Sequence, residues 1–259
     1  MFGADNRLAS QNYCNISHYS HNISQANTGS QAIGDVLIDA SRDGSLWWCN
    51  RFNISNLGGK HQGTDLVDYL RNLGYRVNEL SRDSNCIITE SLLKHNEFVV
   101  RIRPSVSCSY IREEIEAYKN YVKEGGKLIL LGHFMLPGQK DSFAEEFGIT
   151  FEGAVRNERS VNKFIKHPIN QGLKELPYGG CGITRYPEEA TIVAWLSDNT
   201  YLDVSNNEHN IELKEKPGGI PAMGCMRYGS GKIVFLGDTY LFSSVYQPLT
   251  SNILRWLMG

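Results

Sequence analysis

Four polar side chains that could do chemistry stand at or just beyond the ends of short apolar runs. They are Asp39, Arg103, His133 and Asp238. Short apolar runs bounded by loops are typical of buried parallel strands, and ligands of open parallel sheets bind at the carboxyl ends of the strands. Carboxylate, guanidinium and imidazole groups that converge there could bind a polar ligand or transfer protons. We therefore expect a candidate site on one rim of a sheet.

Further candidates share this expected rim. Ser41, Asp43, Ser105 and Thr239 follow the same apolar runs, His61 and Gln62 stand where a helix should begin, and Trp47 and Trp48 lie in the loop before it. The first turn of a helix offers unpaired N–H groups and partial positive charge. The two indoles would suit stacking on a sugar, or they fold over the sheet edge as a small satellite core.

Each of the four principal residues also has a purely structural interpretation. Arg103 would form a rim ion pair with Asp39 or Asp238, and Asp238 would cap the segment that follows it. His133 would be a general base or a metal ligand, because imidazole ordinarily titrates near neutral pH, or it would only hydrogen-bond a loop. The sequence leaves these alternatives open.

Alternating elements must position these residues. We expect strands at about 36–38, 75–80, 98–103, 127–132, 190–196, 222–227 and 232–236, and helices at about 62–73, 89–94, 142–147 and 249–257. A further helix should be capped by Ser109 and ended by Gly125-Gly126, with Thr89 capping the helix before it. Residues 162–191 look rich in loops. The pattern predicts an α/β fold, a flavodoxin-like three-layer sandwich with a mostly parallel central sheet and a C-terminal β-hairpin extension.

Composition narrows the class of protein. The chain has 259 residues and a formal charge of −2, which disfavours nucleic-acid and anionic-membrane partners. No apolar run reaches the roughly 18 residues of a membrane helix and no secretory signal is visible, so we expect a soluble protein of undetermined compartment. The six cysteines form no C-x-x-C pair, and we expect neither a metal nor a cofactor. Residues 1–33 should form an irregular arm, and residues 34–259 one domain.

Three segments carry a resemblance to a known superfamily: Tyr121–Gly132, His167–Gly172 and Tyr228–Thr239. Their order and spacing resemble the class I glutamine-amidotransferase-like superfamily. Within it they look most like the non-catalytic branch typified by GIFT domains, and more distantly like ThuA-like proteins. The active enzymes of this superfamily place a nucleophilic cysteine on the turn after the strand equivalent to 127–132, with a histidine and an acid further on.

The catalytic cysteine of that superfamily has no counterpart here. The turn reads Gly132-His133-Phe134-Met135, and the only histidine of the C-terminal third is His209, which is not part of an H-x-E element. Imidazole cannot replace a thiolate without changing the chemistry, so the Cys-His-Glu triad is absent.

Two hypotheses follow. The first is a non-catalytic module that binds a small polar ligand, such as a carbohydrate, or a protein partner at the rim. The alternative is a hydrolase or sugar-modifying enzyme that uses His133 with Asp39 or Asp238.

Overall fold

The computed structural model describes residues 32–42, 63–81, 86–103, 109–135, 139–204, 210–211 and 219–259. Nearly all of the expected N-terminal arm lies outside these residues. No helix among them has the length and apolar character needed to cross a bilayer.

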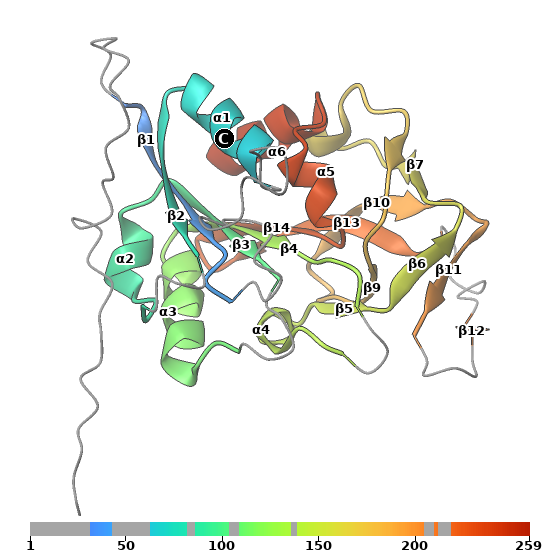
Figure 1. The fold of residues 1–259 in the computed structure, drawn as a ribbon, viewed down its shortest axis with the longest axis horizontal. Coiled ribbons are helices and arrows are strands. Elements are labelled where there is room, and N and C mark those ends of the chain that lie inside the picture. Colours follow the sequence, from blue (N-terminus) through green and yellow to red (C-terminus); the bar gives the residue numbers. More distant parts are fainter. Residues whose placement is uncertain are drawn as a thin grey trace, which may run out of the picture.

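A nine-stranded sheet with the order β2-β1-β3-β4-β14-β13-β10-β7-β8 runs through the molecule (Figure 1). The first five strands pair in parallel: β1 (Gly34–Asp39), β2 (Tyr75–Leu80), β3 (Phe98–Ile102), β4 (Lys127–Leu131) and β14 (Gly231–Leu236). The sheet continues with antiparallel pairings through β13 (Pro221–Tyr228), β10 (Thr191–Leu196), β7 (Ser160–Phe164) and β8 (Leu176–Pro177). The α/β class and the parallel strands agree with the sequence prediction. The expected hairpin, β13–β14, joins the two halves of the sheet instead of extending one edge.

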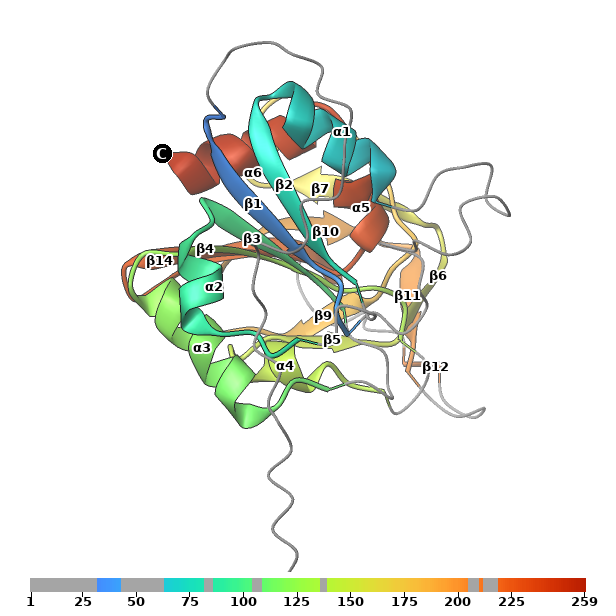
Figure 2. The ribbon, with the colours of Figure 1, turned by 60° about the vertical axis from the view of Figure 1, so that its left-hand side comes forward.

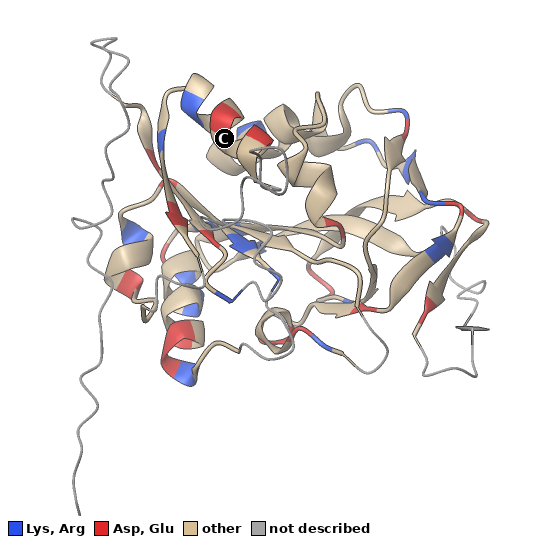
Figure 3. Ribbon diagram, in the orientation of Figure 1, with Lys and Arg blue, Asp and Glu red and all other residues tan. Residues whose placement is uncertain are grey.

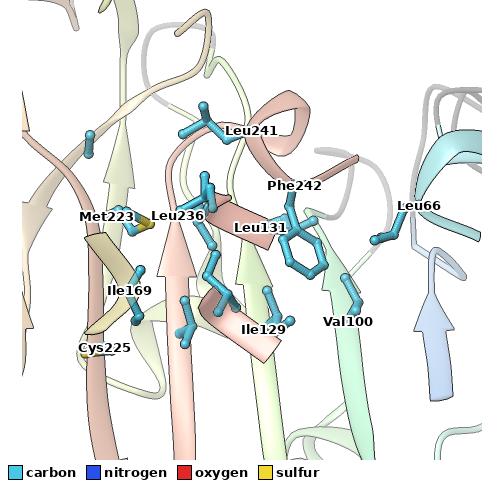
Figure 4. Close-up of a cluster of buried hydrophobic side chains, with 14 of the residues drawn as sticks. Leu66, Val100, Ile129, Leu131, Ile169, Met223, Cys225, Leu236, Leu241 and Phe242 are labelled. Atoms are coloured by element: carbon cyan, nitrogen blue, oxygen red, sulfur yellow. The ribbon is translucent and has the colours of Figure 1, made fainter. Parts of the chain in front are cut away.

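Helices cover both faces of the sheet (Figures 1 and 2). On one face lie α1 (Thr64–Asn72), α5 (Thr239–Ser243), α6 (Leu249–Met258) and the 3-10 turn η4 (Pro168–Asn170), and on the other lie α2 (Glu90–Lys94), α3 (Arg112–Lys123) and α4 (Ser142–Glu145). Alternate residues of each central strand enter two separate buried clusters, as the period of a strand requires. Figure 4 shows Leu241 and Phe242 of α5 beside Leu131 and Leu236 in the first cluster.

The helix starts show one confirmed and one wrong prediction. Thr89 caps α2, and its hydroxyl accepts a hydrogen bond from the Leu92 N–H (3.2 Å). Ser109 does not cap α3, which begins at Arg112. The buried Glu114 carboxylate accepts from the Ile111 N–H and also from the Ile88 N–H, both at 3.0 Å. A carboxylate inside the helix therefore replaces the expected serine.

The region 162–191 contains more strand than expected. It includes the end of β7, then β8 and β9 (Gly182–Arg185), which pairs with β5 (Thr150–Glu152). A third small sheet joins β6 (Ala154–Asn157), β11 (Thr200–Asp203) and β12 (Asn210–Ile211). These strands are two to five residues long, too short for a periodic pattern, so only their pairing partners define them. Acidic and basic residues are interspersed along the ribbon (Figure 3), in keeping with the small formal charge.

Candidate functional site

The carboxyl ends of β1, β3, β4 and β14 form one rim, because these strands are parallel and adjacent in this order. Asp39 ends β1, Arg103 follows β3, His133 lies just after β4 and Asp238 just after β14. The topology thus places all four on the same edge of the sheet. Asp43, Trp47, Trp48, His61, Gln62 and Ser105 lie outside the described residues, and their roles stay predictions.

Asp39 is fully buried and faces the α3 layer. Its Oδ2 accepts hydrogen bonds from the hydroxyls of Tyr110 (2.8 Å) and Tyr118 (2.6 Å), and its Oδ1 accepts from the Ser41 N–H (2.9 Å). Burial, reinforced by the Asp39 charge, raises the pKa of both tyrosines well above the usual range. The tyrosines therefore remain donors, and the carboxylate is engaged in a structural network. Ser41 is buried beside it.

A buried ion pair next to this network was not foreseen from the sequence. The Arg101 Nη2 lies 2.7 Å from the Asp141 Oδ2, and both side chains are completely buried. The guanidinium also stands over the Phe143 ring, 4.5 Å from its centroid, and Asp141 caps α4 by accepting from the Ala144 N–H (3.2 Å). The one available signal was an arginine at a core position of an apolar strand, which requires a buried acidic partner.

The bend after β4 is built by close packing of backbone segments. The Gly132 N–H donates to the Leu236 carbonyl (2.7 Å), and the Thr239 hydroxyl donates to the Gly132 carbonyl (2.6 Å). A Cβ on Gly132 would lie 3.1 Å from the Cys181 Sγ and 3.1 Å from the Gly237 Cα. Close packing thus favours glycine at this position, and the candidate ligand residue Thr239 instead stabilises the bend through its hydroxyl.

Cys181 brings a thiol to this bend from a distant part of the sequence. It is completely buried, and its Sγ donates to the Gly237 carbonyl at 3.2 Å. Burial raises the pKa of this thiol far above its usual value, and the nearby Asp238 charge acts in the same direction. A nucleophile must be a thiolate and must be accessible. Cys181 therefore does not stand in for the missing catalytic cysteine.

Asp238 caps α5, as its structural interpretation predicted. Its Oδ1 accepts from the Tyr240 N–H (2.8 Å) and its Oδ2 accepts from the Gly179 N–H (2.5 Å). Burial raises the pKa of this carboxyl, while the two hydrogen bonds and the charge of His133 partly offset the rise. His133 and Asp238 are thus within electrostatic range, but the carboxylate oxygens are both occupied and the residue is 1% exposed.

Among the described residues just beyond β4 and β14, the exposed side chains are aromatic. The half-buried His133 ring packs against Phe134 (centroids 5.7 Å apart) and Tyr240 (5.6 Å). Phe134 is 37% exposed and Tyr240 40% exposed. We call His133, Phe134 and Tyr240 the rim patch. Arg103 is half-buried, and its Nη2 donates to the Gln139 Oε1 at 2.9 Å.

A second cysteine lies beside a histidine at the opposite edge of the sheet. The Cys225 Sγ and the His167 Nε2 are 3.7 Å apart, and the His167 Nδ1 accepts from the Ile169 N–H at 3.3 Å. Burial raises the pKa of Cys225 to about 12 and lowers that of His167. Both shifts favour the neutral thiol and the neutral imidazole, so the pair lacks the thiolate needed for nucleophilic catalysis. Within the described segments, no three metal-ligating side chains gather at one point.

The sheet order and its covering helices define an α/β sandwich whose first five strands pair in parallel. No protein-family model and no curated protein sequence matches this chain. Among solved structures, the N-terminal domain of mmIFT52 is similar over 87% of this chain and 98% of that domain, with 18% identity and a TM-score of 0.58.

Two bacterial structures are similar over comparable lengths. The cytoplasmic protein STM3548 of Salmonella typhimurium has a TM-score of 0.55, with 13% identity over 87% of this chain and 99% of that one. A ThuA-like protein of Bacteroides uniformis has a TM-score of 0.51, with 14% identity over 90% and 92%. Identities this low establish a common fold and leave function to be argued from the site.

Proposed function

We propose that this chain is a non-catalytic glutamine-amidotransferase-like module that binds a protein partner through the carboxyl-end rim of its sheet. The observation that carries the proposal is the difference in exposure between the acidic and the aromatic side chains of the rim. Among the described residues of the rim, Asp39 and Asp238 are buried in structural hydrogen bonds, whereas the exposed side chains are the aromatic rings of the rim patch.

The hydrogen bonding of the candidate acid–base groups argues against catalysis. A general acid or base must come within hydrogen-bond distance of a substrate proton, directly or through one water. Asp39 is held by two tyrosine hydroxyls and Asp238 by two backbone N–H groups, and neither is exposed. The alternative, a hydrolase using His133 with Asp39 or Asp238, would require the hydrogen-bond network around the acid that it uses to open.

The chemistry of the accessible groups favours a protein over a carbohydrate. A sugar site combines an aromatic platform with several polar groups that bond its hydroxyls. Of the polar residues expected to supply those groups, Asp39, Ser41, Asp238 and Thr239 are buried, Arg103 is half-buried and donates to Gln139, and the others lie outside the described residues. Phe134 and Tyr240 with the intervening imidazole resemble the amphipathic centre of a protein interface, where aromatic residues are enriched.

Site-specific photo-cross-linking tests this proposal. We would place p-benzoylphenylalanine at position 134 or 240 of the full chain, irradiate it in extract of the source cells, and identify the products by mass spectrometry. The control position is 258, because Met258 is similarly exposed (41%) but lies at the end of α6. We expect the same partner protein from positions 134 and 240 and not from 258.

Two results would contradict the proposal. One is cross-linking to nothing, or to the same proteins from all three positions. The other is turnover: release of ammonia from glutamine, or hydrolysis of a glycoside or ester, that His133→Ala abolishes. A rise in melting temperature with neutral sugars that Tyr240→Ala removes would instead identify a carbohydrate as the ligand, since a ligand of the native state stabilises it by mass action.

A further inference from the structure

A cavity of about 360 Å³ opens at the edge of the sheet opposite the rim. Its walls include Arg227 of β13, Lys232 of β14 and Arg255 and Trp256 of α6, with Gln171 and Asn252 beside them. Lys232 stands at the amino-terminal end of β14, in register with Lys127 of β4, whereas the rim begins beyond the carboxyl ends of these same strands. We call this cavity the basic pocket. It is separate from the rim patch.

Three cationic side chains and no acidic side chain line the basic pocket, and the terminal residue Gly259, with its main-chain carboxylate, lines it as well. Across the described part of the chain, no carboxylate lies within ion-pair distance of Arg227, Lys232 or Arg255, although most other arginines and lysines there have such a partner. Arg227 and Arg255 are exposed and Lys232 is half-buried. Like charges gathered in a concave surface raise the local concentration of anions.

Lys232 is held inside the pocket rather than extended into solvent. Its ammonium donates to the Trp256 carbonyl (2.9 Å) and the Leu257 carbonyl (3.3 Å), and it stands 5.3 Å from the centroid of the Trp256 ring. Burial lowers the pKa of this ammonium, and the charges of Arg227 and Lys127 lower it further. Arg227 and Lys127 thus repel the Lys232 ammonium, and a bound anion would relieve that repulsion.

The walls of the pocket are pre-organised by hydrogen bonds. The Asn252 amide donates to the carbonyls of Ile169 (3.1 Å) and Gln171 (2.8 Å), which ties α6 to the η4 turn. The Asn252 Oδ1 accepts from the Arg255 Nη1 at 3.3 Å, which directs that guanidinium along the pocket wall. Pre-organisation of this kind reduces the entropy that a ligand must overcome on binding.

We infer that the basic pocket binds a phosphate group, either as free phosphate or as part of a small phosphorylated molecule. Guanidinium groups match the oxygens of phosphate with paired hydrogen bonds, and an ammonium adds a compact charge. The volume is of the size that holds small molecules. The Trp256 ring already contacts Lys232 and the His167 ring, 6.1 Å away, so the ligand is selected by charge and not by stacking.

The test measures the melting temperature and the calorimetric affinity of the full chain at constant ionic strength. The ligands are inorganic phosphate, glucose 6-phosphate, glucose, citrate and a peptide of six glutamates, with potassium chloride as the salt control. We expect stabilisation by inorganic phosphate or glucose 6-phosphate and none by glucose or potassium chloride. Affinities that differ at least tenfold would show which of the two sources the pocket prefers.

Variants localise the binding. Arg227→Gln and Arg255→Gln remove exposed charges, and each should weaken phosphate binding by about tenfold or more, as expected for the loss of a charged hydrogen bond. Arg112→Gln is the matched control, because Arg112 is also exposed (70%) but lies on α3. Lys232 is left intact because it caps α6. Tyr240→Ala should leave phosphate binding unchanged, which separates this site from the rim.

Several results would overturn the inference. They are no phosphate-dependent stabilisation of the unmodified chain, equal stabilisation by potassium chloride, or equal binding by the Arg227→Gln and Arg255→Gln variants. Preference for citrate or for the acidic peptide over both phosphates would likewise reject phosphate as the ligand.

Discussion

At the scale of single residues, the main finding is that two of the charges buried beneath the rim are paired with each other. Arg101 and Asp141 form a fully buried pair, and within the described part of the chain the Arg101 Nε and Nη1 have no hydrogen-bond partner. Burial of a charge is tolerated only when it is paired, so removing one partner leaves the other without compensation. This pair makes the β3–α4 contact sensitive to substitution.

We predict that Arg101→Met lowers the free energy of unfolding by about 3–5 kcal/mol, the usual effect of breaking a buried pair. The double variant Arg101→Met with Asp141→Ser should lose less, because it removes the stranded carboxylate and keeps an oxygen that can cap α4. Chemical denaturation of the three proteins gives the comparison.

Arg76→Met is the matched control for that experiment. Arg76 pairs with Asp35 at 2.5 Å, but its side chain is 69% exposed. Exposed pairs contribute about 0–1 kcal/mol. A loss for Arg101→Met as small as that for Arg76→Met would refute the predicted role of the buried pair.

At this scale, the sequence predicted which residues lie on the rim better than it predicted which side chains contact them. The ends of the apolar runs correctly located Asp39, His133 and Asp238 at one edge. The tyrosines that bind Asp39 lie 71 or more residues from it along the chain. The cysteine that packs against Gly132 lies 49 residues from it. Such interactions depend on how elements pack, which local pattern does not encode. Whether the rim binds a partner stays a prediction.

At the scale of elements, the bend between β4 and the segment after it is a closely packed junction. The carbonyl and N–H of Gly132 are both hydrogen-bonded, and its backbone packs against Phe151 of β5, Cys181 and Gly237. A side chain at this position would therefore crowd its neighbours.

We predict that Gly132→Ala lowers the free energy of unfolding by about 1–3 kcal/mol, the usual cost of overpacking. Its Cβ would lie 3.0 Å from the Phe151 ring and 3.1 Å from the Gly237 Cα. Gly179→Ala is the control, since the nearest atom to its Cβ would be 3.9 Å away. Thermal unfolding of both variants tests this, and equal stability of the two would contradict it.

The elements themselves were predictable where they are long. β2 was predicted within its observed bounds, and α6 begins at Leu249 as expected. α5 was not predicted, because five residues are too few to show a helical repeat of apolar positions. The capping residue Asp238 was the only local signal of its start. The β13–β14 hairpin and the strand β10 were expected, but the antiparallel pairing of β13, β10 and β7 within the central sheet was not, because it depends on contacts between strands distant in sequence.

At the scale of the whole molecule, the strand pairing changes from parallel to antiparallel at β14. Parallel strands lie on one side of it and antiparallel strands on the other. The two proposed sites use opposite edges of this same region, the rim patch at the carboxyl ends and the basic pocket at the amino ends of β4 and β14. A partner and a phosphate ligand could therefore bind at the same time.

We predict that the amides of β3, β4 and β14 exchange with solvent most slowly. These strands have neighbours on both sides, and their core residues are completely buried. Central strands open only in nearly global unfolding, whereas the small β6–β11–β12 sheet can open locally. Hydrogen exchange followed by mass spectrometry measures this order. Longer protection of β6 and β11 than of β4 and β14 would contradict it.

The central position of β14 has a consequence for synthesis of the protein. β4 is complete about a hundred residues before its neighbour β14 is translated. A growing chain that has emerged only as far as β4 would present that strand as a bare apolar edge, which invites pairing with other chains. We therefore expect the nascent polypeptide to need shielding on the ribosome until its last strand arrives.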